Sequence, residues 1–128
     1  MLRRSRSHRI VLGAEPLVDR PTALRPWREA DIPALVDACQ DPEIPRWTRV
    51  PSPYGEADAR AYMLQRYDAI ATATAAPYAI VSADDDTRLL GSIALMDLEW
   101  EQKRGEVGYW LAREARGAGH ATRAVRLI

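Results

Sequence analysis

The sequence predicts an α/β fold of the α+β type in a single domain. Apolar residues recur at helical spacing in three segments, and other segments carry β-like apolar runs bounded by turn residues. The expected order is strand, two helices, three strands and a helix (β-α-α-β-β-β-α). With 128 residues, 47% of them apolar and 28% charged, the chain has the composition of an ordinary globular protein, which excludes fibrous and wholly disordered classes.

The N-terminal part is expected to contain an arm, a strand and a helix. Residues 1–20 are rich in Arg and Ser without periodicity, so we expect a disordered arm ahead of a domain that spans residues 21–128. Thr22-Ala23-Leu24-Arg25 alternates between polar and apolar residues and lies between prolines, which predicts a short edge strand. Asp31 can cap a helix whose apolar stripe follows i, i+3, i+4, i+7 spacing: Ile32, Leu35, Val36 and Cys39.

A proline-rich loop and a second helix follow. Residues 41–54 contain four prolines, which forbid a continuous helix or a central strand. Residues 56–74 return to helical spacing, with an expected stripe of Ala57, Ala61, Leu64, Tyr67 and Ala71.

Residues 78–128 are expected to form three strands and a helix. Two apolar runs, 78–83 and 89–98, flank the polar turn 84–87 and read as a hairpin, and 104–111 forms the next strand. After the glycine-containing segment 112–119, helical spacing resumes at Ala121, Ala124, Val125 and Ile128.

Charge and cysteine content exclude several functions. Eighteen basic residues balance eighteen acidic ones, so no overall field favours nucleic acid or an anionic membrane. One cysteine and two distant histidines provide neither a disulfide nor a metal cluster, and no apolar run approaches the roughly 20 residues of a membrane span. We expect a cytoplasmic protein without metal, nucleic-acid or membrane partners; RNA binding by Arg3, Arg4, Arg6 and Arg9 remains a lesser alternative.

The segment that indicates a chemical function is the strand 104–111 together with the glycine turn and the helix that follow it. Gly117 and Gly119 allow close approach of the backbone, and the helix that starts there presents unpaired N–H groups and the positive end of its dipole, which suits a phosphate or pyrophosphate. The spacing fits neither the P-loop nor the Rossmann fingerprint, because Thr122 stands where the latter needs Gly or Ala.

The segment Arg116-Gly117-Ala118-Gly119-His120-Ala121 resembles the Arg/Gln-x-x-Gly-x-Gly/Ala loop of the GNAT family of N-acetyltransferases. Further matching segments, in the same order, resemble the RimJ/RimL branch and extend the likeness over about residues 21–128: Leu24-Arg25-Pro26-Trp27, Asp41-Pro42-Glu43-Ile44, Leu90-Gly91-Ser92-Ile93 and Glu106-Val107-Gly108-Tyr109-Trp110-Leu111. The resemblance implies a mixed, mostly antiparallel sheet with flanking helices.

The resemblance also implies acetyl-CoA as the acetyl donor and an amine as the acceptor, either a protein N-terminus or a small molecule. The pyrophosphate would lie on the loop, with Arg116 contacting phosphate or only flanking it, and pantetheine would pair with the strand backbone. The implied cofactor-binding residues are Tyr109, Trp110, Leu111, Arg116, Gly117, Ala118, Gly119, His120, Ala121 and Thr122.

Glu106 is the candidate general base, because strand alternation places it on the face of Gly108 and Trp110. The alternative is an ion pair with Arg104 or Arg88. Trp47, Thr48 and Tyr54 lie in the proline-rich loop, which the family uses in the acceptor wall; the alternative for them is packing. We expect Trp27 and Cys39 in the core.

Compared with a complete family member, the sequence is expected to lack the C-terminal part of the domain, including the strand beyond 104–111 and the tyrosine that protonates the departing thiolate. The 104–111 strand would then have an open edge, which invites pairing with a second copy as a homodimer. The functional alternatives are an N-acetyltransferase, weak or inactive in this form, and a non-catalytic CoA-binding remnant that associates through that edge.

Overall fold

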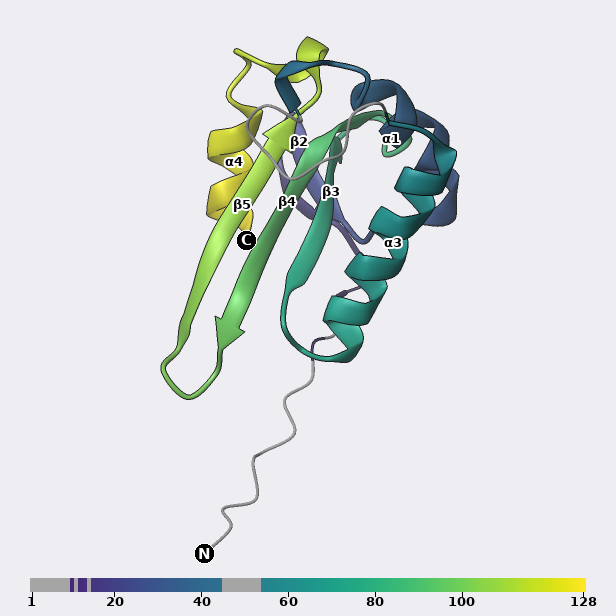
Figure 1. Cartoon of the computed structure of the whole chain (residues 1–128). Coiled ribbons are helices and arrows are strands. Elements are labelled where there is room, and N and C mark those ends of the chain that lie inside the picture. Colours follow the sequence, from purple (N-terminus) through teal and green to yellow (C-terminus); the bar gives the residue numbers. More distant parts are fainter. Residues whose placement is uncertain (1–9, 11, 14, 45–53) are drawn as a thin grey trace, which may run out of the picture.

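The computed structural model describes residues 10, 12–13, 15–44 and 54–128. These residues form one antiparallel sheet of five strands with helices packed against it (Figure 1). The strands lie side by side in chain order, and every neighbouring pair is antiparallel. They are β1 (Leu17–Asp19), β2 (Thr22–Arg25), β3 (Ala76–Ser82), β4 (Leu89–Glu99) and β5 (Arg104–Leu111).

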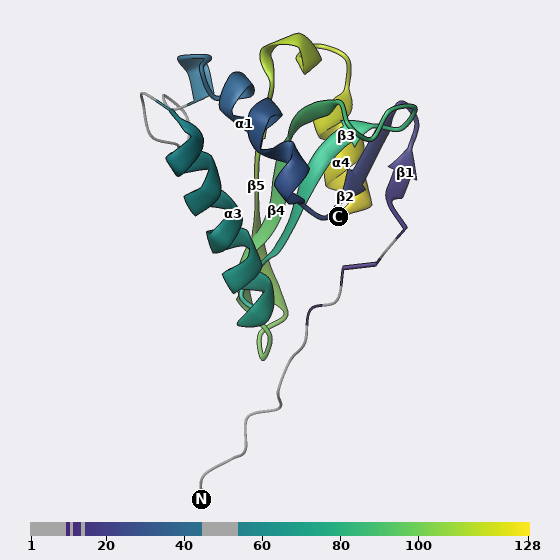
Figure 2. The same cartoon turned by 90° about the vertical axis from the view of Figure 1, so that its right-hand side faces the viewer.

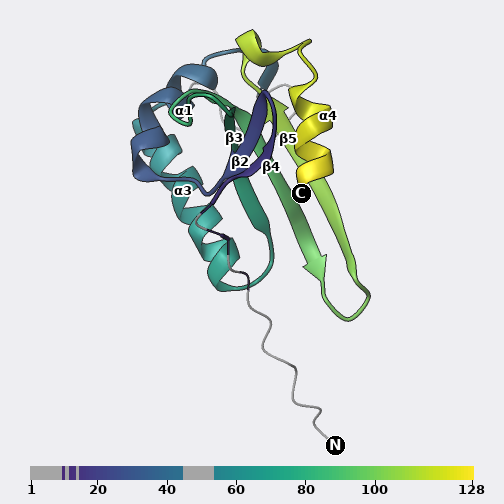
Figure 3. The ribbon, with the colours of Figure 1, turned by 180° about the vertical axis from the view of Figure 1, so that it is seen from behind.

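Helices cover both faces of this sheet. Helix α1 (Ile32–Ala38) and helix α3 (Glu56–Ala71) lie on one face, and helix α4 (His120–Leu127) lies on the other, as the views in Figures 2 and 3 show. Short 3-10 turns, η1 (Glu29–Asp31) and η2 (Arg113–Ala115), precede α1 and α4. The α+β class and the predicted order of helices and strands are confirmed, with β1 as an addition.

Each face of the sheet has its own apolar core, because successive strand residues point to opposite faces. Ala23, Ala79 and Val81 pack toward α1 and α3, whereas Leu24 and Ile80 pack toward α4. Strand β2 is therefore buried along its whole length. Trp27 and Cys39 lie in the first core, at 4% exposure each, as predicted.

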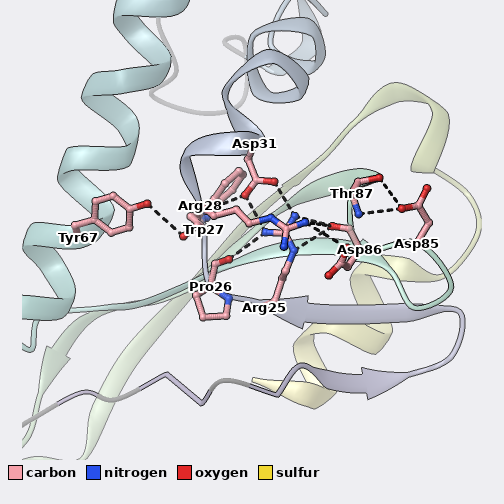
Figure 4. Close-up of polar contacts among 9 residues, drawn as sticks. All are labelled: Arg25, Pro26, Trp27, Arg28, Asp31, Tyr67, Asp85, Asp86 and Thr87. Carbon is pink, nitrogen blue, oxygen red and sulfur yellow. Dashed lines mark hydrogen bonds and ion pairs between the residues drawn. The ribbon is translucent and has the colours of Figure 1, made fainter.

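A buried ion pair connects β2 to the start of the helical layer (Figure 4). The guanidinium of Arg25 donates two hydrogen bonds to the Asp31 carboxylate and two more to the carbonyl oxygen of Asp86 in the β3–β4 turn. Asp31 also accepts a hydrogen bond from the main-chain N–H of Arg28. Asp31 occupies the N-cap position of α1, as predicted, but its carboxylate makes no capping hydrogen bond to that helix because these partners occupy it.

The sheet begins earlier than expected. Strand β1 falls within the segment 1–20 that we expected to be a disordered arm, and Val18 pairs with Ala23. Strand β2 is therefore an inner strand, and the prediction of an edge strand is wrong. The signal was weak because β1 has only three residues, and its apolar side chains are partly exposed, Leu17 by 39% and Val18 by 46%.

The buried face of α3 also differs from the prediction. Ala59 and Met63 enter the core, whereas Leu64 and Tyr67 of the predicted stripe are 67% and 44% exposed. Tyr67 lies at the edge of the helical layer, where its hydroxyl donates to the carbonyl of Trp27. Alanines occur all around this helix and can be buried or exposed, so spacing alone predicted the wrong buried face.

Candidate cofactor-binding site at the start of helix α4

The glycine loop lies between the end of β5 and the start of α4, as the sequence predicts. Gly117 and Gly119 have φ angles of 82° and 78°, in the left-handed region that favours glycine. A Cβ on Gly119 would also lie 2.9 Å from the Arg123 guanidinium, whereas Gly117 faces open space. These conformations turn the chain out of η2 and into the helix.

Main-chain donors are available along this loop. Within α4, the first amide that bonds back along the chain is that of Arg123, which donates to the carbonyl of Gly119 at 3.2 Å. Among the residues that the structure describes, the N–H groups of residues 117–122 have no main-chain acceptor. Free amides at a helix start, reinforced by the helix dipole, are suited to an anion.

The side chain of Arg116, the residue just before the first glycine, makes two contacts outside the loop. One guanidinium nitrogen, Nη2, lies 2.7 Å from Oδ2 of Asp41 and donates to the carbonyl of Leu111 at 3.1 Å. A hydrogen bond from the N–H of Glu43 and the Arg116 charge hold the pKa of Asp41 below its usual value. Asp41 is therefore an anion in contact with the residue that precedes the loop.

His120, the first residue of α4, is buried behind the loop. Its Nδ1 lies 2.7 Å from the hydroxyl oxygen of Thr22 in β2. Burial lowers the His120 pKa, and the charges of Arg123 and Arg88 lower it further. The side chain therefore anchors α4 to the sheet as a neutral imidazole, while its main-chain amide remains part of the loop.

Glu106 lies on β5, opposite Met96 of β4, with an exposed side chain. It shares a strand face with Gly108 and Trp110 by alternation. Arg104 pairs instead with Glu99 at 2.9 Å, and no ion pair of Glu106 occurs within the described ranges. The predicted alternative, a pair with Arg104 or Arg88, is not what the structure shows.

Strand β5 forms an edge of the described sheet and carries the residues expected to face pantetheine. Trp110 is buried in the core, Leu111 is half-buried, and Tyr109 is 53% exposed. Tyr109 borders a shallow groove of about 280 Å³ together with α4 residues Ala121, Thr122, Val125 and Arg126. The groove runs along the side of the helix that begins at the glycine loop.

Only one of the three residues expected in the acceptor wall lies in the described part of the chain, and it is buried. Trp47 and Thr48 lie outside the described residues. Tyr54 is 5% exposed, and its hydroxyl has no hydrogen-bond partner within the described part of the chain. Burial raises its pKa. Tyr54 thus packs in the core that lies under α1 and α3.

Sequence reasoning did not identify Asp41 and Thr22 as neighbours of the loop. Both are polar residues far from the loop along the chain, and although Asp41 opens one of the segments that resemble the family, no sequence pattern connects either residue to the loop. Only the three-dimensional arrangement brings them to Arg116 and His120.

This combination of an antiparallel sheet, a left-handed glycine loop and a helix start that offers free amides defines an α+β domain with an anion-binding loop. The chain belongs to the acetyltransferase (GNAT) domain family, whose profile matches residues 22–128. None of the curated proteins matches the sequence. No helix in the described part of the chain combines the length and apolar character needed to cross a membrane.

Solved structures confirm the fold. A Vibrio cholerae protein, provisionally assigned as a ribosomal-protein-serine acetyltransferase, superposes with a TM-score of 0.76 at 16% identity, covering 90% of this chain and 64% of that one. RimL, a ribosomal L7/L12 α-N-protein acetyltransferase in complex with coenzyme A, gives 0.72 at 18% identity, covering 88% and 64%. Mycobacterium smegmatis RimJ in complex with a CoA disulfide gives 0.69 at 18%, covering 83% and 53%. The chain thus spans less than two-thirds of the length of these proteins.

Proposed function

We propose that this chain is an N-acetyltransferase that binds acetyl-CoA on the glycine loop and transfers the acetyl group to an amine. The observation that carries the proposal is the set of free amides at residues 117–122, where Gly117 and Gly119 hold the backbone in a left-handed turn. Family membership and the CoA complexes of RimL and RimJ support the same donor.

The residues of the loop and of β5 have separate tasks in this proposal. Acetyl-CoA supplies a thioester whose carbonyl carbon is open to attack by a neutral amine. The amides of residues 117–122 hold the pyrophosphate. The outer backbone groups of Tyr109, Trp110 and Leu111, at the β5 edge, pair with the amide-bearing arm. An N–H at this edge stabilises the negative charge that develops on the carbonyl oxygen.

Glu106 is proposed as the general base. An acceptor ammonium must lose a proton before its nitrogen can attack, and the exposed Glu106 carboxylate is not committed to an ion pair within the described part of the chain. It would accept that proton directly or through a water molecule. After the C–N bond forms, the C–S bond breaks, and the second proton that the nitrogen loses goes to the departing CoA thiolate. The acceptor is proposed to be a protein N-terminus or a small-molecule amine.

The test of donor binding is calorimetric titration of acetyl-CoA into the full chain and two loop variants. Gly119→Ala and Gly119→Glu both place a Cβ at a residue with φ of 78°, so both share the backbone strain. Only Gly119→Glu adds a negative charge beside the anion site. Binding by the wild type that is weakened by alanine and abolished by glutamate supports the site; no binding by the wild type refutes it.

A second candidate is a non-catalytic CoA-binding protein that associates through β5. The observation that favours it is the β5 edge, where Val107 is 43% and Tyr109 53% exposed. Sedimentation over a range of concentrations, combined with an acetylation assay on amine acceptors, separates the two candidates. Stoichiometric CoA binding with self-association and no turnover would support the second.

A further inference from the structure

The glycine loop is held on both sides by side chains that reach the N-terminal half of the chain. Arg116 immediately precedes Gly117 and contacts Asp41, which follows α1. His120 immediately follows Gly119 and contacts Thr22 in β2. We call Arg116–Asp41 and His120–Thr22 the two flanking contacts.

The first flanking contact joins opposite charges in a partly enclosed place. Asp41 has a side-chain exposure of 10%, compared with 38% for Arg116. Its other carboxylate oxygen, Oδ1, accepts a hydrogen bond from the N–H of Glu43 at 3.1 Å, which fixes the carboxylate relative to the backbone. Because Arg116 Nη2 also donates to the carbonyl of Leu111, one guanidinium connects the end of β5, the loop and the end of α1.

The second flanking contact is fully enclosed. Thr22 is completely buried and His120 is 9% exposed, so a missing partner would leave a polar atom without water. Helix α4 packs directly on β2. The contact therefore fixes the first residue of the helix to the inner part of the sheet.

Inside the loop, only Arg123 adds contacts to these: its guanidinium donates to the carbonyl of Ala118 at 2.7 Å, and its main-chain N–H donates to the carbonyl of Gly119, among the residues that the structure describes. Two of the three loop residues, 117–119, are glycines, which have the largest backbone freedom, and ordering a residue costs about 1–2 kcal/mol. A loop ordered only on binding would subtract this cost from the affinity, whereas a loop already held in the binding conformation would not.

We infer that the two flanking contacts hold the glycine loop in its binding conformation, which makes Asp41 and Thr22 positioning residues for CoA although neither belongs to the loop. The inference rests on the proposed function for its choice of ligand. The part of the inference that concerns the loop itself, namely that the two flanking contacts order its backbone, applies to the protein without ligand as well.

The first experiment is calorimetric titration of CoA into the wild-type chain, Asp41→Asn and Thr22→Val. Each variant should bind on the order of five- to tenfold more weakly, as expected from the loss of one ion pair in Asp41→Asn or of one hydrogen bond in Thr22→Val. Thr22→Ser keeps the hydroxyl and should restore affinity. Circular dichroism at the titration temperature verifies that each variant is folded.

Two controls remove comparable contacts elsewhere. Tyr62→Phe breaks the 2.7 Å hydroxyl contact between Tyr62 and Ser92, and Asp85→Asn alters a carboxylate that accepts hydrogen bonds from Thr87. Both controls should keep wild-type affinity for CoA even where thermal stability falls. Equal affinity of Asp41→Asn, Thr22→Val and the wild type would overturn the inference, as would equal losses in the controls.

The second experiment needs no ligand. Amide ¹⁵N relaxation should give rigid-backbone order parameters of about 0.85 for Gly117, Ala118 and Gly119 in the wild type and values that fall toward about 0.6 in Asp41→Asn and Thr22→Val. Unchanged values in both variants would overturn the inference. If the wild type does not bind CoA, the proposed function fails, and the relaxation result still decides whether the contacts order the loop.

Discussion

The carboxylate of Asp31 lies 2.7 and 2.8 Å from two guanidinium nitrogens of Arg25, and both side chains are buried, at 3% and 7% exposure. The geometry is bidentate, and the remaining guanidinium donors reach the carbonyls of Asp86 and Pro26 (Figure 4). One buried cation therefore joins β2, the start of α1 and the β3–β4 turn.

Asp31→Asn should be strongly destabilising. The substitution leaves the Arg25 charge buried without its counter-ion, which typically costs about 3–5 kcal/mol of the free energy of unfolding. Urea denaturation followed by circular dichroism measures this change. Glu29→Gln is the control, because Glu29 and Arg60 form an exposed pair at 3.4 Å whose loss should cost less than about 1 kcal/mol. Equal effects of the two substitutions would contradict a structural role for the buried pair.

Gly91→Ala should disrupt the contact between β4 and β5, whereas Gly108→Ala in the same strand pair should be tolerated. A Cβ on Gly91 would overlap the carbonyl oxygen of Trp110 and lie 3.0 Å from Cα of Leu111, so backbone must move. A Cβ on Gly108 would meet the end of the flexible Met96 side chain at 2.5 Å. Thermal unfolding should show a loss of roughly 1–3 kcal/mol for Gly91→Ala, and a smaller loss for Gly108→Ala.

Much of the sheet and the position of the loop follow from local patterns. Strand β5 coincides with the predicted 104–111, and the glycines lie at the predicted strand-to-helix turn. Partners far apart in the chain could not be predicted, because no spacing rule connects Thr22 to His120 or Asp41 to Arg116. The buried face of α3 was predicted wrongly for a related reason. Which side of a helix is buried depends on the surface against which it packs, and the alanines of α3 are small enough to fit on either side.

Glu106→Gln should lower acetyl transfer by about 10²–10⁴-fold if Glu106 is the general base. The amide keeps the size of the side chain and removes its ability to accept the proton, so CoA affinity should not change. Steady-state turnover with an amine acceptor and calorimetry with CoA measure the two quantities. Glu114→Gln, in η2, is the control for loss of an acidic side chain. Full turnover with an unaltered pH profile in Glu106→Gln would exclude the assigned role.

Cys39 should resist alkylation in the folded protein. Burial raises the pKa of its thiol to about 12, so at pH 8 the thiolate is roughly a thousandfold less populated than in a free cysteine. Iodoacetamide labelling followed by mass spectrometry should be slow under native conditions and fast in denaturant. Native labelling at the rate of a free thiol would show that Cys39 is accessible and that the core under α1 opens readily.

The stability contributed by His120 should decrease on acidification. Burial, Arg123 and Arg88 lower its folded-state pKa below the ordinary value of 6.5, so between these two pKa values the unfolded chain binds more protons than the folded one. The stabilisation is therefore complete above about pH 6.5 and is lost as the pH falls from there toward the folded-state pKa. Urea unfolding between about pH 7.5 and pH 5 should show a steeper loss in the wild type than in His120→Gln, which has no titrating group at this position.

A second substitution tests the cause of that pKa shift. Arg88→Gln removes one of the two cations that disfavour the imidazolium, so the folded-state pKa of His120 should rise toward 6.5 and the acid-dependent loss should become smaller. NMR titration of the His120 ring measures the shift directly. A ring pKa at or above 6.5 in the wild type would contradict this shift, and a ring pKa above 7 would mean that His120 is mostly charged at neutral pH. Its contact with Thr22 would then have to be one in which the protonated Nδ1 donates to the hydroxyl oxygen.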